Sequence, residues 1–142
     1  MRILALDLGE RRIGVAVSDD DETFARGLGV IERNGGEVNR ICEIATMYRV
    51  EKIVYGLPLR MDGSLSPRGE KMLGLITKLK EKLPLEFVPW DERLTTKEAE
   101  NILIMANMSR AKRKRIRDKL AAQIILQSYL DSRMLKDTNC QE

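Results

Sequence analysis

The chain has 142 residues, of which 43% are hydrophobic and 33% charged; this excludes a disordered polymer and suits one globular domain. Its formal net charge of +3 is mild, and it contains no histidine, which excludes mechanisms that need an imidazole base or a histidine metal ligand. Any metal would therefore be held by carboxylates, which favours magnesium or manganese.

Cysteine use and hydropathy bear on the compartment. Cys42 and Cys140 provide no disulfide framework, and two distant cysteines do not suit a zinc site. No apolar run is long enough to span a bilayer, and Met1 leads into a first strand without a small-residue cleavage site. We therefore expect a cytoplasmic protein that is not bound to a membrane.

The first third of the chain has the pattern of three strands. Residues 2–8 form a mostly apolar run, residues 12–19 form a second, and a third strand is expected around residues 25–32. The first two are joined by a short turn that begins at Gly9. Such short connections are typical of an antiparallel meander.

Helices and strands alternate in the rest of the chain. Ser66 followed by Pro67 is typical of a helix start, and Thr95 with Glu98 forms a capping box. The expected order is a helix over 36–49, a strand over 52–57, a helix over 67–83, a strand over 85–90, a helix from Thr95 and a last helix from Ser109 to about Met134.

This order predicts an α/β fold with a mixed five-stranded sheet. Three strands are antiparallel, two are added in parallel through helical crossovers, and helices cover both faces. We expect a single domain over residues 1–134, followed by a polar tail over residues 135–142.

Asp7 is the first candidate for chemistry. Its strand is apolar on both faces, as in a central strand, and a carboxylate at the end of such a strand costs free energy unless it is paired or bound to metal. The alternative is that Asp7 only begins the turn into Gly9, as aspartate often does.

Asp91 and Glu92 follow the fifth strand directly. Open α/β sheets usually place their sites in loops after parallel strands. The alternative is that these acids only favour the start of the helix capped by Thr95. Strand alternation places the two side chains on opposite faces, so we expect only one of them to be a ligand.

Asp118 lies in the last predicted helix. Helical spacing places it on one face with Ala122, Ile125 and Tyr129, so it points with the apolar stripe. The alternative is that it balances the basic side chains of the preceding turn. Together with Asp7 and one of Asp91 and Glu92, Asp118 could form an oxygen-lined site for two divalent ions roughly 3.5–4 Å apart, suited to phosphodiester cleavage.

Basic residues indicate a polyanionic partner. Seven cations lie between Ser109 and Lys119, a run that favours phosphate contact over a solvated face. The turn after the first strand also carries two arginines, although an ordinary hairpin turn would explain its spacing. The residues expected to contact nucleic acid are Arg11, Arg12, Arg93, Lys112, Arg113, Lys114 and Arg117.

Four blocks of sequence resemble the YqgF family, in order and over nearly the whole chain to about residue 131. The blocks are Asp7-Leu8-Gly9 with 12–19, Gly56-Leu57-Pro58-Leu59 with 61–64, 91–96, and 112–114 with 118–122 and 125–130. The chain departs from the family pattern at Arg11, Arg60 and Ser66, where lysine, asparagine and glycine are common; the departures concern substrate contact.

The resemblance implies a ribonuclease H-like fold and a metal-dependent nuclease. The family is described both as Holliday-junction resolvases and as nucleases for the 5′ end of pre-16S ribosomal RNA. Its acidic site maps onto Asp7, the Asp91-Glu92 pair and Asp118, with magnesium or manganese as the cofactor.

Three functions follow as hypotheses. The first is a nuclease that matures pre-16S rRNA. The second is a junction resolvase for branched DNA, which needs two active sites related by a two-fold axis and so a homodimer instead of a monomer. The third is a non-catalytic RNA-binding factor of ribosome assembly, in which the carboxylates are structural.

Overall fold

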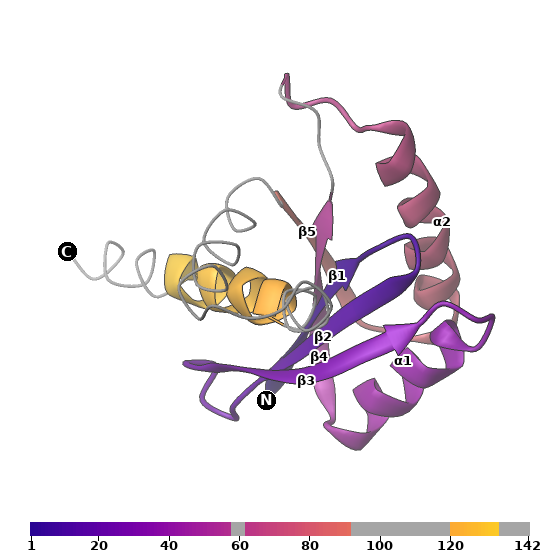
Figure 1. The fold of residues 1–142 in the computed structure, drawn as a ribbon. Coiled ribbons are helices and arrows are strands. Elements are labelled where there is room, and N and C mark those ends of the chain that lie inside the picture. Colours follow the sequence, from indigo (N-terminus) through magenta and orange to yellow (C-terminus); the bar gives the residue numbers. More distant parts are fainter. Residues whose placement is uncertain (58–61, 92–119, 134–142) are drawn as a thin grey trace, which may run out of the picture.

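A computed structural model describes residues 1–57, 62–91 and 120–133 of the chain (Figure 1). The elements are β1 (Arg2–Leu8), β2 (Arg12–Ser18), β3 (Ala25–Glu32), α1 (Glu37–Met47), β4 (Val50–Leu57), α2 (Pro67–Lys82) and β5 (Glu86–Asp91), and residues 120–133 are helical. None of the helices formed by these residues combines the length and hydropathy needed to span a bilayer.

The strands form one five-stranded sheet in the order β3-β2-β1-β4-β5. β2 pairs antiparallel with both β1 and β3, whereas β4 pairs parallel with both β1 and β5. This confirms the predicted mixed sheet. β1 is central, so its residues are screened from solvent by strands on both sides.

One face of the sheet carries large aliphatic side chains. In β1 they are Leu4, Leu6 and Leu8, which are at most 1% exposed and pack with the buried sides of α1 and α2. These two helices lie together on one side of the sheet in Figure 1. The buried sides of α1 and α2 follow from their apolar spacing, which places one apolar stripe of each helix against the sheet.

Residues 120–133 cover the other face. Ile3 and Ala5 of β1, Ala16 of β2 and Val54 of β4 pack there against the helix. The helix, orange to yellow in Figure 1, crosses the side of the sheet opposite α1 and α2. The expectation of helices on both faces is confirmed.

Element boundaries agree with the sequence patterns to within two or three residues. Ser66 caps α2 as predicted, because its hydroxyl accepts a hydrogen bond from the backbone N–H of Gly69 at 3.0 Å. β4 begins at Val50 instead of residue 52, because Val50 already pairs with Arg2 of β1, before a register shift after which Lys52 pairs with Ile3. The predicted helix at Thr95 lies outside the described residues.

Candidate active site at the ends of the parallel strands

Asp7 lies near the carboxyl end of β1, between Gly14 of β2 and Gly56 of β4 in the register. It is half-buried. Side chains alternate along a strand, so Asp7 shares the face of Ile3 and Ala5, which is the face covered by residues 120–133. Asp7 Oδ1 lies 3.9 Å from the position that a Cβ atom of Gly56 would take, which agrees with this placement.

A row across the sheet joins Asp7 to two residues that sequence reasoning did not single out. In the parallel register Asp7 pairs with Gly56, and Gly56 pairs with Trp90 of β5. Two strand spacings separate Asp7 from Trp90, roughly 10 Å between Cα atoms. Trp90 packs with the same cluster as Ala5 and Val54, so the row lies on one face.

Trp90 anchors the helix that covers this row. Its ring meets Tyr129 edge to face, with centroids 5.7 Å apart and an interplanar angle of 88°. Trp90 Nε1 is buried and has no hydrogen-bond partner among the described residues. An aromatic contact therefore fixes the helix above β5.

The turn after Asp7 is tight and is held by contacts from Arg33, the residue that follows β3. The N–H of Gly9 donates to the carbonyl of Arg12 at 2.9 Å, and a Cβ atom at Gly9 would collide with that oxygen, so the turn requires glycine. Arg33 donates from Nη1 to the carbonyl of Gly9 at 3.2 Å and from its backbone N–H to the carbonyl of Arg11 at 2.8 Å. This bracing holds the carboxyl end of β1 in place.

The other candidate ligands are only partly within the described chain. Asp91 is the last residue of β5 and pairs in register with Leu57, at the same edge of the sheet as Asp7. Glu92 and Asp118 lie outside the described residues. Residues 1–57, 62–91 and 120–133 alone bring together no group of three acidic, cysteine or histidine side chains that could hold a metal ion.

The described helix over residues 120–133 bears on the apolar stripe predicted for this part of the chain. Ala122 and Ile125 are fully buried and Tyr129 is 8% exposed, and all three pack toward the sheet face of Asp7. This confirms the apolar stripe with which Asp118 was predicted to align. Gln127 lies outside this stripe and is half-buried; its Oε1 accepts from Ala25 N–H at 2.9 Å.

Two of the predicted nucleic-acid contacts are described. Arg11 is exposed at the turn. Arg12 is half-buried, and its Nε lies 3.4 Å from a carboxylate oxygen of Glu32. The predicted contacts outside the described residues are Arg93, Lys112, Arg113, Lys114 and Arg117.

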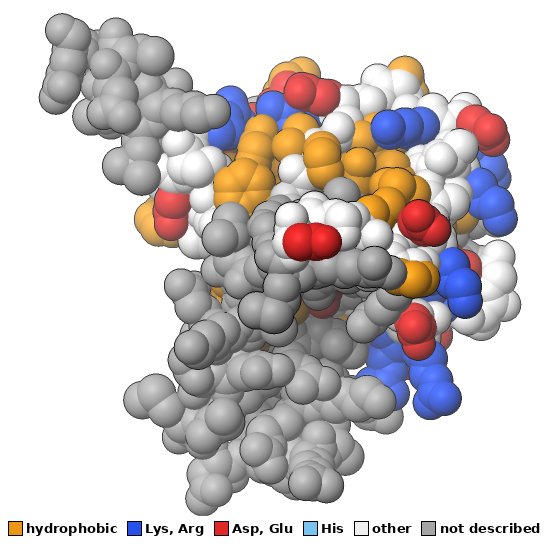
Figure 2. Space-filling view, turned by 90° about the horizontal axis from the view of Figure 1, so that it is seen from above, with side chains coloured by type: hydrophobic (Ala, Val, Ile, Leu, Met, Phe, Trp, Pro, Cys, Tyr) orange, Lys and Arg blue, Asp and Glu red, His pale blue; other side chains and the backbone are white. Residues whose placement is uncertain are grey.

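Charges are mixed on the face that Figure 2 shows. In the view of Figure 2, hydrophobic side chains gather in a patch, and basic and acidic side chains both lie around it. The described residues on this face therefore present no surface of a single charge.

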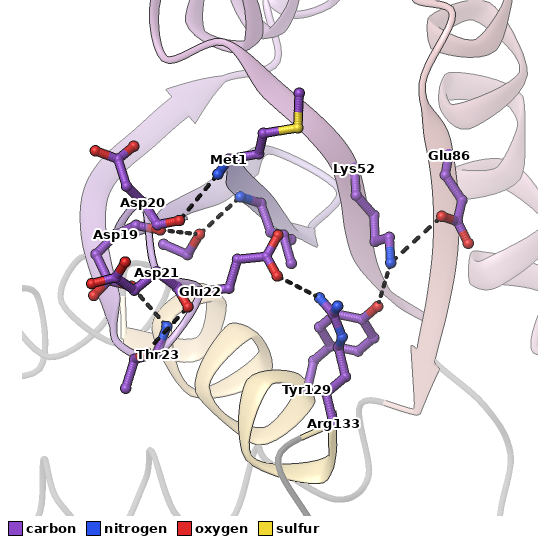
Figure 3. Close-up of polar contacts among 12 residues, drawn as sticks. Met1, Asp19, Asp20, Asp21, Glu22, Thr23, Lys52, Glu86, Tyr129 and Arg133 are labelled. Carbon is purple, nitrogen blue, oxygen red and sulfur yellow. Dashed lines mark hydrogen bonds and ion pairs between the residues drawn. The ribbon is translucent and has the colours of Figure 1, made fainter. Parts of the chain in front are cut away.

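The other end of the sheet, at the amino ends of the parallel strands, is held by polar contacts (Figure 3). Lys52 donates to the hydroxyl of Tyr129 at 2.9 Å and lies 3.5 Å from Glu86, and Arg133 pairs with Glu22 at 3.1 Å. The hydrogen bond to Tyr129 raises the pKa of Lys52 above its ordinary value. The far end of residues 120–133 is thus tied to both β4 and the loop before β3.

Acidic groups at this end of the sheet are shifted by hydrogen bonds. A hydrogen bond from Glu51 lowers the pKa of Glu22, and the same bond raises the pKa of Glu51. Backbone N–H groups of Thr23 and Phe24 lower the pKa of Asp19. These groups stabilise the loop before β3 and lie at the amino end of β1, away from Asp7.

The site also includes residues that the sequence patterns did not identify. Gly56 was noted within a family block without a structural role, although a glycine inside a strand often marks a close approach. Trp90 ends the strand expected over residues 85–90, and that pattern assigns it no role in the site. No sequence pattern identifies Arg33, because its contacts to the turn depend on the pairing of β2 with β3.

Known proteins resemble this chain over nearly its whole length. Residues 1–132 match the RuvX family, which is described as Holliday junction resolvase. A protein of Caldanaerobacter subterraneus subsp. tengcongensis named "Putative pre-16S rRNA nuclease" is 53% identical over 135 residues, covering 93% of this chain and 97% of that protein. One of Desulforamulus reducens with the same name is 50% identical over 134 residues, covering 93% and 98%.

A solved structure shows the same fold. RuvC of T. thermophilus, in complex with a Holliday junction substrate, matches with a TM-score of 0.60 and 18% identity over 94% of this chain and 96% of that chain. The likeness confirms the expected ribonuclease H-like fold. Given the match over residues 1–132 and the two relatives, the chain belongs to the RuvX family, which is the YqgF family that the four sequence blocks resemble.

Proposed function

We propose that this protein is a metal-dependent nuclease that hydrolyses phosphodiester bonds at the 5′ end of pre-16S rRNA. The observation that carries the proposal is the position of Asp7 at the carboxyl end of β1, on the face covered by residues 120–133. The relatives named for this activity, at 53% and 50% identity, support the choice of substrate.

The donor set fits a hard divalent cation. Asp7 offers carboxylate oxygens at the edge where Asp91 ends β5, and the chain has no histidine. We assign Asp7, Glu92 and Asp118 as the ligands of magnesium or manganese. When bound, the metal would supply activation of water and stabilisation of the leaving oxygen.

The choice of Glu92 over Asp91 rests on alternation. Val88 and Trp90 lie on the face of Asp7, so a strand continued for one residue beyond Asp91 carries position 92 on that face. By the same alternation, position 91 would then be on the opposite face, and Asp91 would not bind the metal.

The remaining residues of the proposal bind and orient the substrate. Arg11 lies exposed on the turn next to Asp7, and the basic run between Ser109 and Lys119 precedes the helix that covers the site. We assign these cations to the phosphate backbone, which positions the scissile bond without reading its sequence. The proposed domain covers residues 1–134, and the proposed location is the cytoplasm.

A second candidate is resolution of four-way DNA junctions. The description of the matching family favours it. It requires a homodimer, because two strands must be cut symmetrically.

The proposal is tested by cleavage of two labelled substrates of equal length, a pre-16S rRNA 5′ leader and a four-way junction, each with magnesium and with manganese. We expect metal-dependent cleavage of the rRNA leader at a defined position. Cleavage of the junction alone supports the resolvase. Binding of RNA without cleavage in either metal contradicts both nuclease functions and supports a non-catalytic assembly factor.

A further inference from the structure

Gly56 lies where the sheet, the covering helix and Asp7 meet. It pairs with Asp7 on one side and with Trp90 on the other, and it lies inside β4, where glycine weakens a strand. A Cβ atom built on Gly56 would lie 2.8 Å from Cδ1 and 3.8 Å from Cγ1 of Ile125, and 3.9 Å from Oδ1 of Asp7. Non-bonded carbon atoms normally stay about 3.5–4.0 Å apart.

Ile125 has little freedom to give way to a side chain at position 56. It is fully buried and packs in one cluster with Ile3, Ala5 and Val54. Interiors of this kind are close-packed, so Cδ1, the end of the Ile125 side chain, can shift only at the expense of its neighbours. A methyl group at position 56 would therefore displace the end of Ile125, move the helix away from β4 or press on the neighbouring carboxylate.

We infer that Gly56 is a positioning residue for Asp7. Its missing side chain leaves room for Ile125 to sit directly on β4 and for the Asp7 carboxylate to keep its place beside Gly56. A side chain at position 56 would disturb both the orientation of Asp7 and the height of the helix above the sheet. This inference rests on the proposed metal-dependent function and adds to it the residue that sets the ligand geometry.

The test measures manganese binding to the full chain by the electron paramagnetic resonance signal of free Mn²⁺. The variants are Gly56→Ala, Ile125→Val, and the two together; Ile125→Val removes Cδ1, the atom that the new Cβ would strike. Asp7→Asn gives the binding that does not depend on the site. Gly74→Ala is the matched control, because a Cβ atom there meets nothing within 4 Å.

We expect Gly56→Ala to weaken Asp7-dependent Mn²⁺ binding by roughly 10- to 100-fold, as loss of ligand orientation does. Ile125→Val and Gly74→Ala should bind like the wild type, and the double variant should recover most of the loss. Circular dichroism and melting temperature report whether each variant is folded. Recovery in the double variant identifies the contact with Ile125 as the cause.

Other outcomes are equally decisive. If Gly56→Ala binds Mn²⁺ like the wild type, Gly56 has no positioning role. If Gly56→Ala fails to fold, the double variant carries the test: a folded, binding double variant supports the inference, and an unfolded or non-binding one overturns it. A wild-type chain that binds no Mn²⁺ through Asp7 contradicts the proposed function itself and removes the basis of the inference.

Discussion

The two faces of the sheet are built from different side chains. On the face of α1 and α2, β1 contributes Leu4, Leu6 and Leu8, an ordinary aliphatic core. On the other face the same strand contributes Ile3, Ala5 and Asp7, and neighbouring strands add glycine and alanine at Gly14, Ala16 and Gly56.

With the proposed function, one strand would serve both stability and chemistry. Large side chains bury more apolar area, and so the α1–α2 face is expected to supply more of the hydrophobic stabilisation. Small side chains let a helix approach the backbone closely and leave room for a carboxylate. Substitutions on the two faces should therefore separate stability from function.

The largest effect is expected from Asp7→Asn. Asparagine keeps the volume of aspartate but removes the charge that a divalent ion needs, so cleavage should fall below about 1% of the wild-type rate while the fold survives. Asp118→Asn should behave alike. The measurement is single-turnover cleavage, with Asp21→Asn in an exposed loop as the control that retains activity. Near-normal turnover of Asp7→Asn in manganese would show that the metal-site assignment is wrong.

The second-largest effect is expected from substitutions of Glu92 and Asp91, the two acidic residues at and after the end of β5. Glu92→Gln should reduce cleavage more than Asp91→Asn, because a strand continued beyond Asp91 would carry position 92 on the Asp7 face, after Val88 and Trp90. Parallel rate measurements at saturating metal decide the order. A greater loss in Asp91→Asn would reverse the assignment of the ligand.

On the opposite face, Leu6→Ala should affect stability and not metal binding. Leu6 is fully buried, and truncation of such a side chain costs about 2–5 kcal/mol of unfolding free energy. Urea denaturation measures the loss, and Mn²⁺ titration of the folded variant should match the wild type. A folded Leu6→Ala protein with impaired Mn²⁺ binding would mean that the two faces are not independent.

The basic run gives a smaller effect on binding. Replacing Arg113 and Lys114 together by glutamine should flatten the dependence of log affinity on log salt by roughly 1.5 units, if both contact phosphate. Affinity is measured across a salt series without divalent metal, and all nucleic acids should weaken about equally. The control exchanges the exposed Lys71 and Lys78 of α2. An unchanged slope in the test variant would identify the run as a solvated face.

The smallest effect is expected from Tyr129→Phe. It removes the hydroxyl that accepts the hydrogen bond from Lys52 but keeps the ring against Trp90, so the unfolding free energy should fall by about 0.5–1.5 kcal/mol. Urea denaturation measures the change. Tyr48→Phe is the matched control, because the hydroxyl of Tyr48 makes only a long contact of 3.5 Å, with Arg26 at the surface. Equal losses in both variants would mean that the Lys52 contact adds nothing specific.

Local patterns predicted most of the fold. The apolar run of β1, the Ser66-Pro67 start of α2 and the apolar stripe through Ala122 and Ile125 are properties of neighbouring residues, which the sequence displays directly. Asp7 could be proposed as a candidate for the same reason, because a carboxylate in an apolar strand is visible without any tertiary contact.

The support around Asp7 could not be predicted in this way. Gly56 meets Ile125 only because β4 pairs with β1 in one register and the helix crosses that pair. Arg33 reaches the turn after β1 only because β3 lies beside β2. Such contacts join distant parts of the chain, and their partners are chosen by packing and not by local spacing.

The assignment of Asp7 as a metal ligand is tested most directly by a crystal structure of the wild-type chain soaked with Mn²⁺, with the ion located by anomalous scattering. We expect an anomalous peak about 2.1 Å from a carboxylate oxygen of Asp7, at the carboxyl end of β1 on the face of residues 120–133. Asp7→Asn crystals should lack this peak. A manganese ion bound elsewhere, with none at Asp7, would show that Asp7 is not a metal ligand.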